Sequence, residues 1–531
     1  MNVSQDEKDH NMKRLFVCCD GTWNSDSDEF QGVPVPTNVV RFFNALSERG
    51  DDGIEQLRYY HVGIGANEGR VRRVIDGALG LGLSRDIRTA YKWLSDHYEE
   101  GSEIFVIGFS RGAFTARSLV GMLHHCGLPH RATWVLVKEA WNLYRLDPKI
   151  PANVSRQERF RAAHGEPPPI RFLGVWETVG ALGIPEIAQL FGLGRQRFEF
   201  HDTTLSPEVE RAVQALAIDE QRNNFFPTLW TDADGCDPVR VTQLWFPGVH
   251  ADVGGGYKET GLSDATLKWM IAEAARCGAV FEPAMLEQLA DADQSSPSAV
   301  HGVLHNSLTG FYRRIGFRPR SFPYLAKDSR ICAESISALA LARQADPPIF
   351  QAPYRPNINP AMPVQVRVFA SPLWNWTGIF MKEGVRYRFK VPEGQTWLDG
   401  DSASGAEGTR GNGLLRLLAW SKRVKAANWF ELCGAISYPA EPAEPGEDGV
   451  PPEPFYFRIG REVEIEAPHS GYLYCFANDA SWAYWNNQGS LRVEIVESSG
   501  VQAGKTAHPA SDEDLTAPAT APGGYGAGQP S

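Results

Sequence analysis

Residues 103–119, EIFVIGFSRGAFTARSL, have the pattern of a strand, a tight turn and a helix. The run Glu103–Ile107 is short and apolar, as a buried strand requires, and the run from Ala113 to Leu119 predicts a helix. Between them lies Gly108-Phe109-Ser110-Arg111-Gly112, a G-x-S-x-G sequence. A serine in a tight turn between a strand and a helix is an exposed nucleophile, so the order of these elements predicts catalysis by Ser110.

The neighbours of Ser110 fit this chemistry. Glycines avoid side-chain clashes in the turn, and the N-terminus of the following helix presents backbone N–H groups to a developing oxyanion. We expect Arg111 to contribute one such N–H. A second donor is expected from Gly21 or Thr22, where the first strand runs into a turn. The alternative is a serine that only caps a helix.

A serine nucleophile needs a histidine base and a carboxylate that orients the base, in the chain order serine, acid, histidine for an α/β-hydrolase. We assign the base to His250, which ends an apolar strand in a glycine-rich loop. Asp219 follows the preceding strand, and this topology predicts that it is the acid. Glu177 and Asp252 remain alternative acids, although Asp252 is so near His250 that it is expected to shape the loop. Such a triad requires no cofactor.

The chain divides into parts of different character. Alternating apolar strands and helices over residues 14–343 predict an α/β domain with a mostly parallel sheet, of the α/β-hydrolase kind. Residues 344–363 are rich in Pro and predict a linker. Alternating strands over 364–498 predict an all-β sandwich, and residues 499–531 predict a disordered tail.

Composition excludes several classes of protein. The formal charge of −12 comes without a long basic block, so binding to nucleic acid is not expected. The polar N-terminus lacks the apolar core of a Sec signal, and no stretch approaches the roughly 20 apolar residues of a membrane span. We therefore expect a protein that is cytoplasmic at synthesis and that makes at most peripheral contact with a membrane.

Several motifs together resemble one known family. They are Cys19-Asp20-Gly21-Thr22-Trp23-Asn24, Thr37-Asn38-Val39, Gly108-Phe109-Ser110-Arg111-Gly112-Ala113, Gly174-Val175-Trp176-Glu177-Thr178-Val179-Gly180 and His250-Ala251-Asp252-Val253-Gly254-Gly255. In this order they resemble the catalytic domain of type VI secretion phospholipase effectors. The resemblance implies a triad of Ser110, Asp219 and His250 that acts on membrane lipids. One departure is Glu177, where the family usually has Asp.

A second pattern lies in the C-terminal part, in residues 471–479, GYLYCFAND, and 484–491, YWNNQGSL. These residues are similar to a calcium-dependent, galactose-binding lectin of the PA-I type. It implies that Asp479, Asn486 and Asn487 supply oxygens to a calcium ion, which suits a hard cation. The alternative is an Asn-rich hairpin turn that binds nothing.

Together these features predict a serine hydrolase of carboxylic esters, specifically an A1- or A2-type phospholipase of the antibacterial effector kind. The resemblance to secretion effectors further implies export by type VI secretion, with a secretion-machine adaptor and an immunity protein as partners. The similarity to a lectin implies a glycan as a further partner. One alternative is a cytoplasmic esterase acting on carbohydrate or small-molecule esters. Another is an inactive hydrolase fold whose function is glycan binding.

Overall fold

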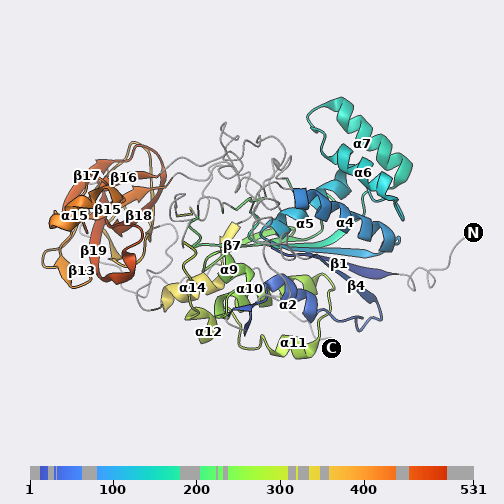
Figure 1. Ribbon diagram of the computed structural model, residues 1–531, viewed down its shortest axis with the longest axis horizontal. Helices are drawn as coiled ribbons and strands as arrows, with labels where there is room; N and C mark the ends of the chain where they lie inside the picture. Colours follow the sequence, from blue (N-terminus) through green and yellow to red (C-terminus); the bar gives the residue numbers. More distant parts are fainter. Residues whose placement is uncertain are drawn as a thin grey trace, which may run out of the picture.

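Figure 1 shows the computed structural model of the chain. The structure describes residues 12–21, 29–30, 33–61, 81–179, 204–222, 225, 227–230, 237–308, 319–320, 334–346, 348, 358–437 and 454–498. The tail predicted at 499–531 and the candidate donor Thr22 lie outside these residues. Among the described helices, none combines the length and the apolar character needed to cross a membrane.

A seven-stranded sheet in the order β4-β1-β5-β6-β7-β8-β9 forms the N-terminal part, and every neighbouring pair in it is parallel. Its strands are β1 (Lys13–Cys19), β4 (Glu55–His61), β5 (Glu103–Phe109), β6 (Ile170–Trp176), β7 (Ala212–Ala217), β8 (Val241–Phe246) and β9 (Glu334–Ile336). A separate two-stranded sheet consists of β2 (Glu29–Phe30) and β3 (Val33–Pro34).

Helices cover both faces of the parallel sheet (Figure 1). One face carries α4 (Leu81–His97), α5 (Arg111–Cys126), α6 (Trp134–Tyr144) and α7 (Pro151–His164). The other carries α2 (Asn38–Ala45), α9 (His250–Gly254), α10 (Gly261–Arg276), α11 (Pro283–Glu287), α12 (Pro297–Val300) and α14 (Ala338–Ala345). Successive residues of β1 alternate between two cores: Leu15 and Val17 pack in one, and Phe16 and Cys18 in the other. Burial on both faces explains the continuous apolar runs.

The C-terminal part is antiparallel. One sheet has the order β14-β13-β19-β12-β17, with β10 also paired to β19, and the other has the order β11-β18-β15-β16. The first comprises β10 (Val364–Phe369), β12 (Arg386–Lys390), β13 (Trp397–Asp399), β14 (Ser402–Ser404), β17 (Glu462–Glu466) and β19 (Asn487–Glu497). The second comprises β11 (Asn375–Met381), β15 (Leu432–Ile436), β16 (Phe455–Arg458) and β18 (Gly471–Ala477). Short helical segments occur at α15 (Gly413–Leu417), η4 (Ala419–Ser421) and η5 (Tyr484–Asn486). Side chains from both sheets share one buried core, as in a sandwich.

The predicted fold class, a mostly parallel sheet with flanking helices followed by an all-β sandwich, is confirmed. The strand patterns of the sequence did not predict β2, β3, β9, β11, β13, β14 and β15. The strand β9 has only three residues, two of them polar, and β15 contains Gly434. A Cβ atom at Gly434 would lie 2.3 Å from the ring of Phe457, so packing against this ring explains a glycine inside a buried strand. The domain boundaries remain predictions.

Candidate active site

The turn at Ser110 joins β5 to α5. Its backbone dihedrals are φ 57° and ψ −120°, a conformation that residues with a side chain rarely adopt. The backbone N–H of Ser110 donates to the carbonyl of Trp176 at 3.0 Å. Backbone strain of about 1–3 kcal/mol is typical of residues held for a function. The predicted strand, turn and helix are therefore present, with the serine in the strained position that a nucleophile of this kind occupies.

Two glycines allow the turn to form. A Cβ atom on Gly108 would lie 2.6 Å from the carbonyl oxygen of Gly112. One on Gly112 would lie 2.1 Å from the carbonyl oxygen of Cys19, at the end of β1. Both contacts are with backbone atoms, so neither could relax by a side-chain rotation. The structure thus confirms that Gly108 and Gly112 serve this turn.

His250 is the first residue of the short helix α9, in the loop that follows β8. Its ring lies 4.7 Å from the ring of Phe109, the residue before Ser110, and 4.9 Å from that of Phe225. Burial lowers the pKa of His250, and the positive charge of Arg222 lowers it further, although Glu177 opposes both effects. The imidazole is therefore neutral at pH 7, the form that can accept a proton.

Glu177 is the carboxylate that contacts the imidazole. Its Oε2 lies 3.1 Å from Nδ1 of His250. The residue follows β6, has a φ of 48° and is completely buried. Its Oε1 accepts a hydrogen bond from the backbone N–H of Ala217 at 2.6 Å. The side chain thus extends from the end of β6 across the end of β7 to the histidine.

Arg320 neutralises this buried carboxylate. Its two terminal nitrogens each donate to one oxygen of Glu177 at 2.8 Å, and they also donate to the carbonyls of Ala217 and Phe225. Burial alone would raise the pKa of Glu177, but Arg320 and His250 outweigh it and lower the pKa. Glu177 is therefore ionised, and such a paired fork geometry fixes its orientation.

Asp219, which the sequence analysis favoured as the acid, has another place in the structure. Its Oδ2 accepts from the backbone N–H of Gly248 at 2.7 Å, and its own N–H donates to the carbonyl of Gly248 at 3.0 Å. These bonds continue the β7–β8 pairing beyond the strands and tie the two loops together. The structure thus pairs His250 with Glu177 and differs from the predicted pairing with Asp219. The physical reason is the reach of the glutamate side chain over the end of β7.

The neighbouring Glu220 was not singled out from the sequence. Its Oε2 accepts from the backbone N–H of His250 at 3.2 Å and from Arg222 at 2.8 Å. Ser307 donates to its Oε1 at 3.0 Å. Burial opposes its ionisation, but Arg222 and other positive charges lower the pKa of Glu220 to about 2. It is an ionised anchor for the start of α9.

Asp252 shapes the loop, as expected. Its Oδ2 accepts from the backbone N–H groups of Val249 at 3.0 Å and of His305 at 3.1 Å. Its Oδ1 lies 2.5 Å from Nδ1 of His305. These contacts secure the first turn of α9 and so fix the backbone that carries His250.

The two described candidates for oxyanion donors, Arg111 and Gly21, differ in the position and bonding of their backbone N–H groups. Arg111 is the first residue of α5, so its backbone N–H belongs to the helix N-terminus. The N–H of Gly21 donates to Oδ1 of Asp20 at 2.6 Å. The other oxygen of Asp20 accepts from Thr37 and Tyr60, both at 2.7 Å, which agrees with a structural role for this aspartate.

A second group of polar residues lies in the sandwich, around the end of β13 and the start of β19. Asn487 donates to Oδ2 of Asp479 at 3.2 Å, and Asn486 donates to Oδ1 of Asp399 at 2.8 Å. The amide oxygens of Asn486 and Asn487 are buried and accept no hydrogen bond within the described parts of the chain. Burial and the charge of Asp399 raise the pKa of Asp479 to about 6. Of the sequence-predicted calcium ligands, Asp479 and Asn487 are in direct contact, whereas the side chain of Asn486 contacts Asp399.

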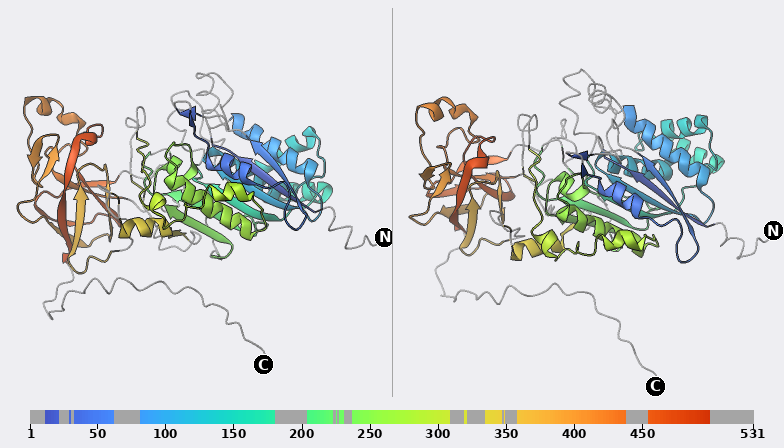
Figure 2. Two further views of the ribbon diagram at one scale, coloured as in Figure 1. Left: turned by 90° about the horizontal axis from the view of Figure 1, so that it is seen from below. Right: turned by 60° about the horizontal axis from the view of Figure 1, so that its bottom comes forward.

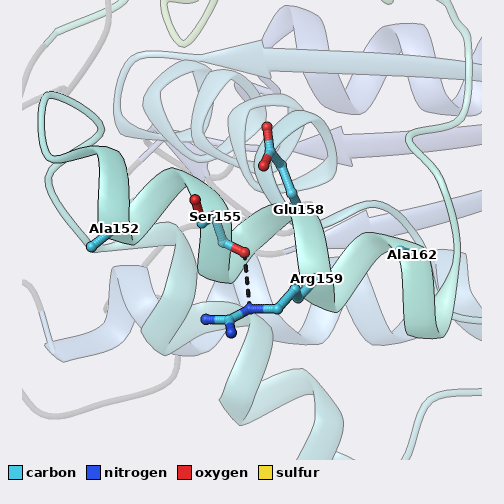
Figure 3. Close-up of a pocket in the computed structure, with 5 residues that line it drawn as sticks. All are labelled: Ala152, Ser155, Glu158, Arg159 and Ala162. Carbon is cyan, nitrogen blue, oxygen red and sulfur yellow. Dashed lines mark hydrogen bonds between the residues drawn. The ribbon is translucent and has the colours of Figure 1, made fainter.

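A surface depression on α7 lies apart from both groups (Figure 3). Its lining residues are Ala152, Ser155, Glu158, Arg159 and Ala162. Arg159 donates to the backbone carbonyl of Ser155 at 3.2 Å. All five belong to one exposed helix face, and none is a candidate site residue.

Comparisons with known proteins come from sequences and from solved structures. A yeast relative, the uncharacterized protein YEL023C of Saccharomyces cerevisiae, is 23% identical, over 52% of this chain and 59% of its own length. The chain thus spans about three fifths of that relative. A crystal structure of an uncharacterized protein from Pseudomonas aeruginosa is 19% identical, with a TM-score of 0.33, over 55% of this chain and 50% of the other.

Two further structures match different parts of the chain. The Tle1 effector bound to the VgrG spike of the type 6 secretion system is 19% identical, with a TM-score of 0.29, over 47% of this chain and 52% of the other. The N-terminal domain of EclA, a PllA-like lectin, is 16% identical, with a TM-score of 0.18, over 25% of this chain and 94% of the other.

The family comparison covers Ser110, Glu177, His250 and the strands of the parallel sheet from β1 to β8, but not β9. Residues 13–273 match the family described as the catalytic domain of Tle1-like phospholipase effectors of type VI secretion. The match extends over just under half of the chain.

Proposed function

We propose that the N-terminal part is a serine ester hydrolase in which Ser110 is the nucleophile, His250 the base and Glu177 the orienting acid. The observation that carries the proposal is the bond between His250 Nδ1 and the ionised, buried Glu177. A neutral imidazole held at Nδ1 presents Nε2 as the proton acceptor. The strained turn at Ser110 adds the second element of such a site.

The chemistry follows the acyl-transfer sequence. The Oγ atom of Ser110 attacks the ester carbonyl carbon while its proton passes to Nε2 of His250. The Nδ1–H group donates to Glu177, whose charge stabilises the imidazolium. The backbone N–H of Arg111 stabilises the oxyanion. The imidazolium then protonates the departing alkoxide, and water hydrolyses the acyl-enzyme by the same route.

We propose membrane phospholipids as the substrate class, with cleavage at the sn-1 or sn-2 ester. The match of residues 13–273 to the catalytic domain of a phospholipase effector family supports this choice. The test is fatty-acid release from phosphatidylethanolamine and phosphatidylglycerol vesicles by wild type and Ser110→Ala. Release by wild type only supports the proposal, and lipids labelled at one acyl position distinguish A1 from A2 cleavage.

Other outcomes point to other functions. Wild type that reacts with a fluorophosphonate probe at Ser110, but cleaves acetylated glycans or small esters in place of vesicles, would identify a cytoplasmic esterase. Wild type that neither reacts with the probe nor hydrolyses any ester would leave glycan binding by the sandwich as the function.

A calcium site in the sandwich is a second proposal, supported by the buried amide oxygens of Asn486 and Asn487, to which no described residue donates a hydrogen bond. These oxygens, together with the carboxylate of Asp479, would hold the cation, since calcium prefers oxygen ligands. The bound ion would supply a contact point for the hydroxyl groups of a glycan. Retention on a galactose resin in calcium, reversed by a chelator, tests the glycan part.

We propose that the protein is delivered to a target cell by a type VI secretion machine, with an adaptor or spike partner and an immunity protein in the producing cell. The match of residues 13–273 to a family of type VI secretion effectors supports this route. Pull-down of the full chain with spike proteins of the producing strain tests it. A chain that binds none of them and is not secreted by an active machine would contradict the route.

A further inference from the structure

The sandwich packs directly against the hydrolase sheet. One buried cluster contains Leu216 of β7 and Trp245 of β8 together with Trp374, Tyr472 and Tyr474 of the C-terminal part. Figures 1 and 2 show the sandwich beside α14, at one end of the N-terminal part. The two parts therefore share a core, which a freely tethered binding module would not do.

One hydrogen bond crosses this interface to the candidate site. The hydroxyl of Tyr474, on β18, donates to the backbone carbonyl of Arg320. The ring of Tyr474 is buried and packs edge-on against Trp374 with centroids 5.9 Å apart. The hydroxyl is thus delivered by a rigid strand.

Arg320 connects this contact to the catalytic dyad. Its side chain holds both oxygens of Glu177 at 2.8 Å, and Glu177 in turn contacts His250. The backbone position of Arg320 determines where its guanidinium can reach. A bidentate pair is sensitive to displacement of the arginine, because both hydrogen bonds require the planar guanidinium to face the carboxylate.

We infer that Tyr474 is a positioning residue for catalysis: by holding the backbone of Arg320, it keeps the guanidinium on Glu177 and so orients His250. The C-terminal sandwich is then part of the catalytic apparatus of the N-terminal part. The inference rests on the proposed function of Glu177. It goes beyond a targeting role for the sandwich, because a displaced Arg320 would leave a buried carboxylate without its main compensating charge.

The test uses the full chain with Tyr474→Phe, which removes only the hydroxyl. The matched control is Tyr387→Phe, which removes a buried tyrosine hydroxyl elsewhere in the sandwich, where it accepts from the N–H of Lys382 at 2.9 Å. We expect kcat for the ester substrate to fall about tenfold in Tyr474→Phe, with KM unchanged. The control should keep the wild-type kcat. Equal kcat values in the two variants would overturn the inference.

A stability measurement separates this inference from the proposed function. If Tyr474 acts through Arg320 on Glu177, the effects of Tyr474→Phe and Glu177→Gln on unfolding in urea will be coupled. The double variant should lose less stability than the sum of the single variants, whereas Tyr387→Phe and Glu177→Gln should be additive. If the losses of unfolding free energy are additive for Tyr474→Phe with Glu177→Gln as well as for Tyr387→Phe with Glu177→Gln, the inference that Tyr474 acts on Glu177 is overturned. If Tyr474→Phe and Glu177→Gln are coupled in stability but the wild-type protein hydrolyses no ester, the proposed function is overturned and the positional link between Tyr474 and Glu177 is not.

Discussion

Glu177 Oε2 and His250 Nδ1 lie 3.1 Å apart, although 73 positions separate the two residues in the chain. The parallel sheet brings them together, because β6 and β8 both end at the edge where α9 begins. The side chain of Glu177 extends across the end of β7 to the histidine and accepts two hydrogen bonds from Arg320. An ionised carboxylate and a neutral imidazole are therefore fixed in the relation that general-base catalysis requires.

The pH dependence follows from these two groups. Because burial lowers the pKa of His250 below its usual value of about 6.5, the base is deprotonated throughout neutral pH. The value of kcat/KM should be constant near pH 7 and fall only as the pH drops through the lowered pKa. In Glu177→Gln the falling limb should move to still lower pH, because Glu177 raises the pKa of His250. Profiles of kcat/KM against pH check both shifts. A limb centred above pH 7 in wild type would contradict this prediction.

Removal of the arginine should destabilise the fold. Arg320→Met leaves the buried charge of Glu177 unpaired, which costs about 3–5 kcal/mol of unfolding free energy. Urea denaturation measures this loss. The double variant Arg320→Met/Glu177→Met should recover most of the stability, because it contains no unpaired buried charge. It should remain inactive, because it lacks the acid that orients His250. If Arg320→Met is as stable as wild type, the ion pair between Arg320 and Glu177 does not contribute to the free energy of unfolding.

The glycine after the nucleophile should not accept a methyl group. In Gly112→Ala the new Cβ would be 2.1 Å from the carbonyl of Cys19, so we expect a loss of about 3 kcal/mol and loss of activity. Gly413→Ala is the control, because its Cβ would meet nothing within 4 Å. Thermal unfolding compares the two. Equal melting temperatures would mean that the turn is less tightly packed than the structure shows.

Calcium should stabilise the chain through the sandwich. At a calcium concentration about 100 times the Kd, binding adds about 2.7 kcal/mol to the unfolding free energy. In Asp479→Asn the affinity should fall at least about tenfold, because the variant lacks a charged ligand. Asp401→Asn, an exposed residue of the nearby hairpin, should bind as wild type. Calorimetric titration with calcium measures all three proteins, and an absence of binding heat and of stabilisation in wild type would exclude the site.

Ser110 and His250 could be singled out from the sequence because each lies in a local pattern, a strand followed by a glycine-rich turn. The choice between Asp219 and Glu177 could not be made in this way, since both follow neighbouring strands of the same sheet. In the structure Glu177 contacts His250, and this contact depends on the length of the glutamate side chain and on its positive φ, neither of which is visible in strand order. Arg320 gave no signal at all, because 143 positions separate it from Glu177 and only the folded chain places it there.

The parallel sheet was predictable for a related reason. Its strands are buried on both faces, so their apolar runs are continuous and stand out. In the sandwich, β11 and β15 were harder to recognise, because Gly378 and Gly434 interrupt their patterns. Contacts such as Tyr474 with Arg320 depend on how the two parts pack together, which strand patterns do not encode.

If Glu177 orients His250 for attack by Ser110, the rate at which a fluorophosphonate probe labels Ser110 depends on Glu177. The rate is measured for wild type, Glu177→Gln and Asp219→Asn, with folding verified by thermal unfolding. We predict a fall of about 10³-fold or more in Glu177→Gln, and a rate within about tenfold of wild type in Asp219→Asn, whose side chain can still accept from Gly248. A wild-type rate in Glu177→Gln, with the large loss in Asp219→Asn, would contradict the account.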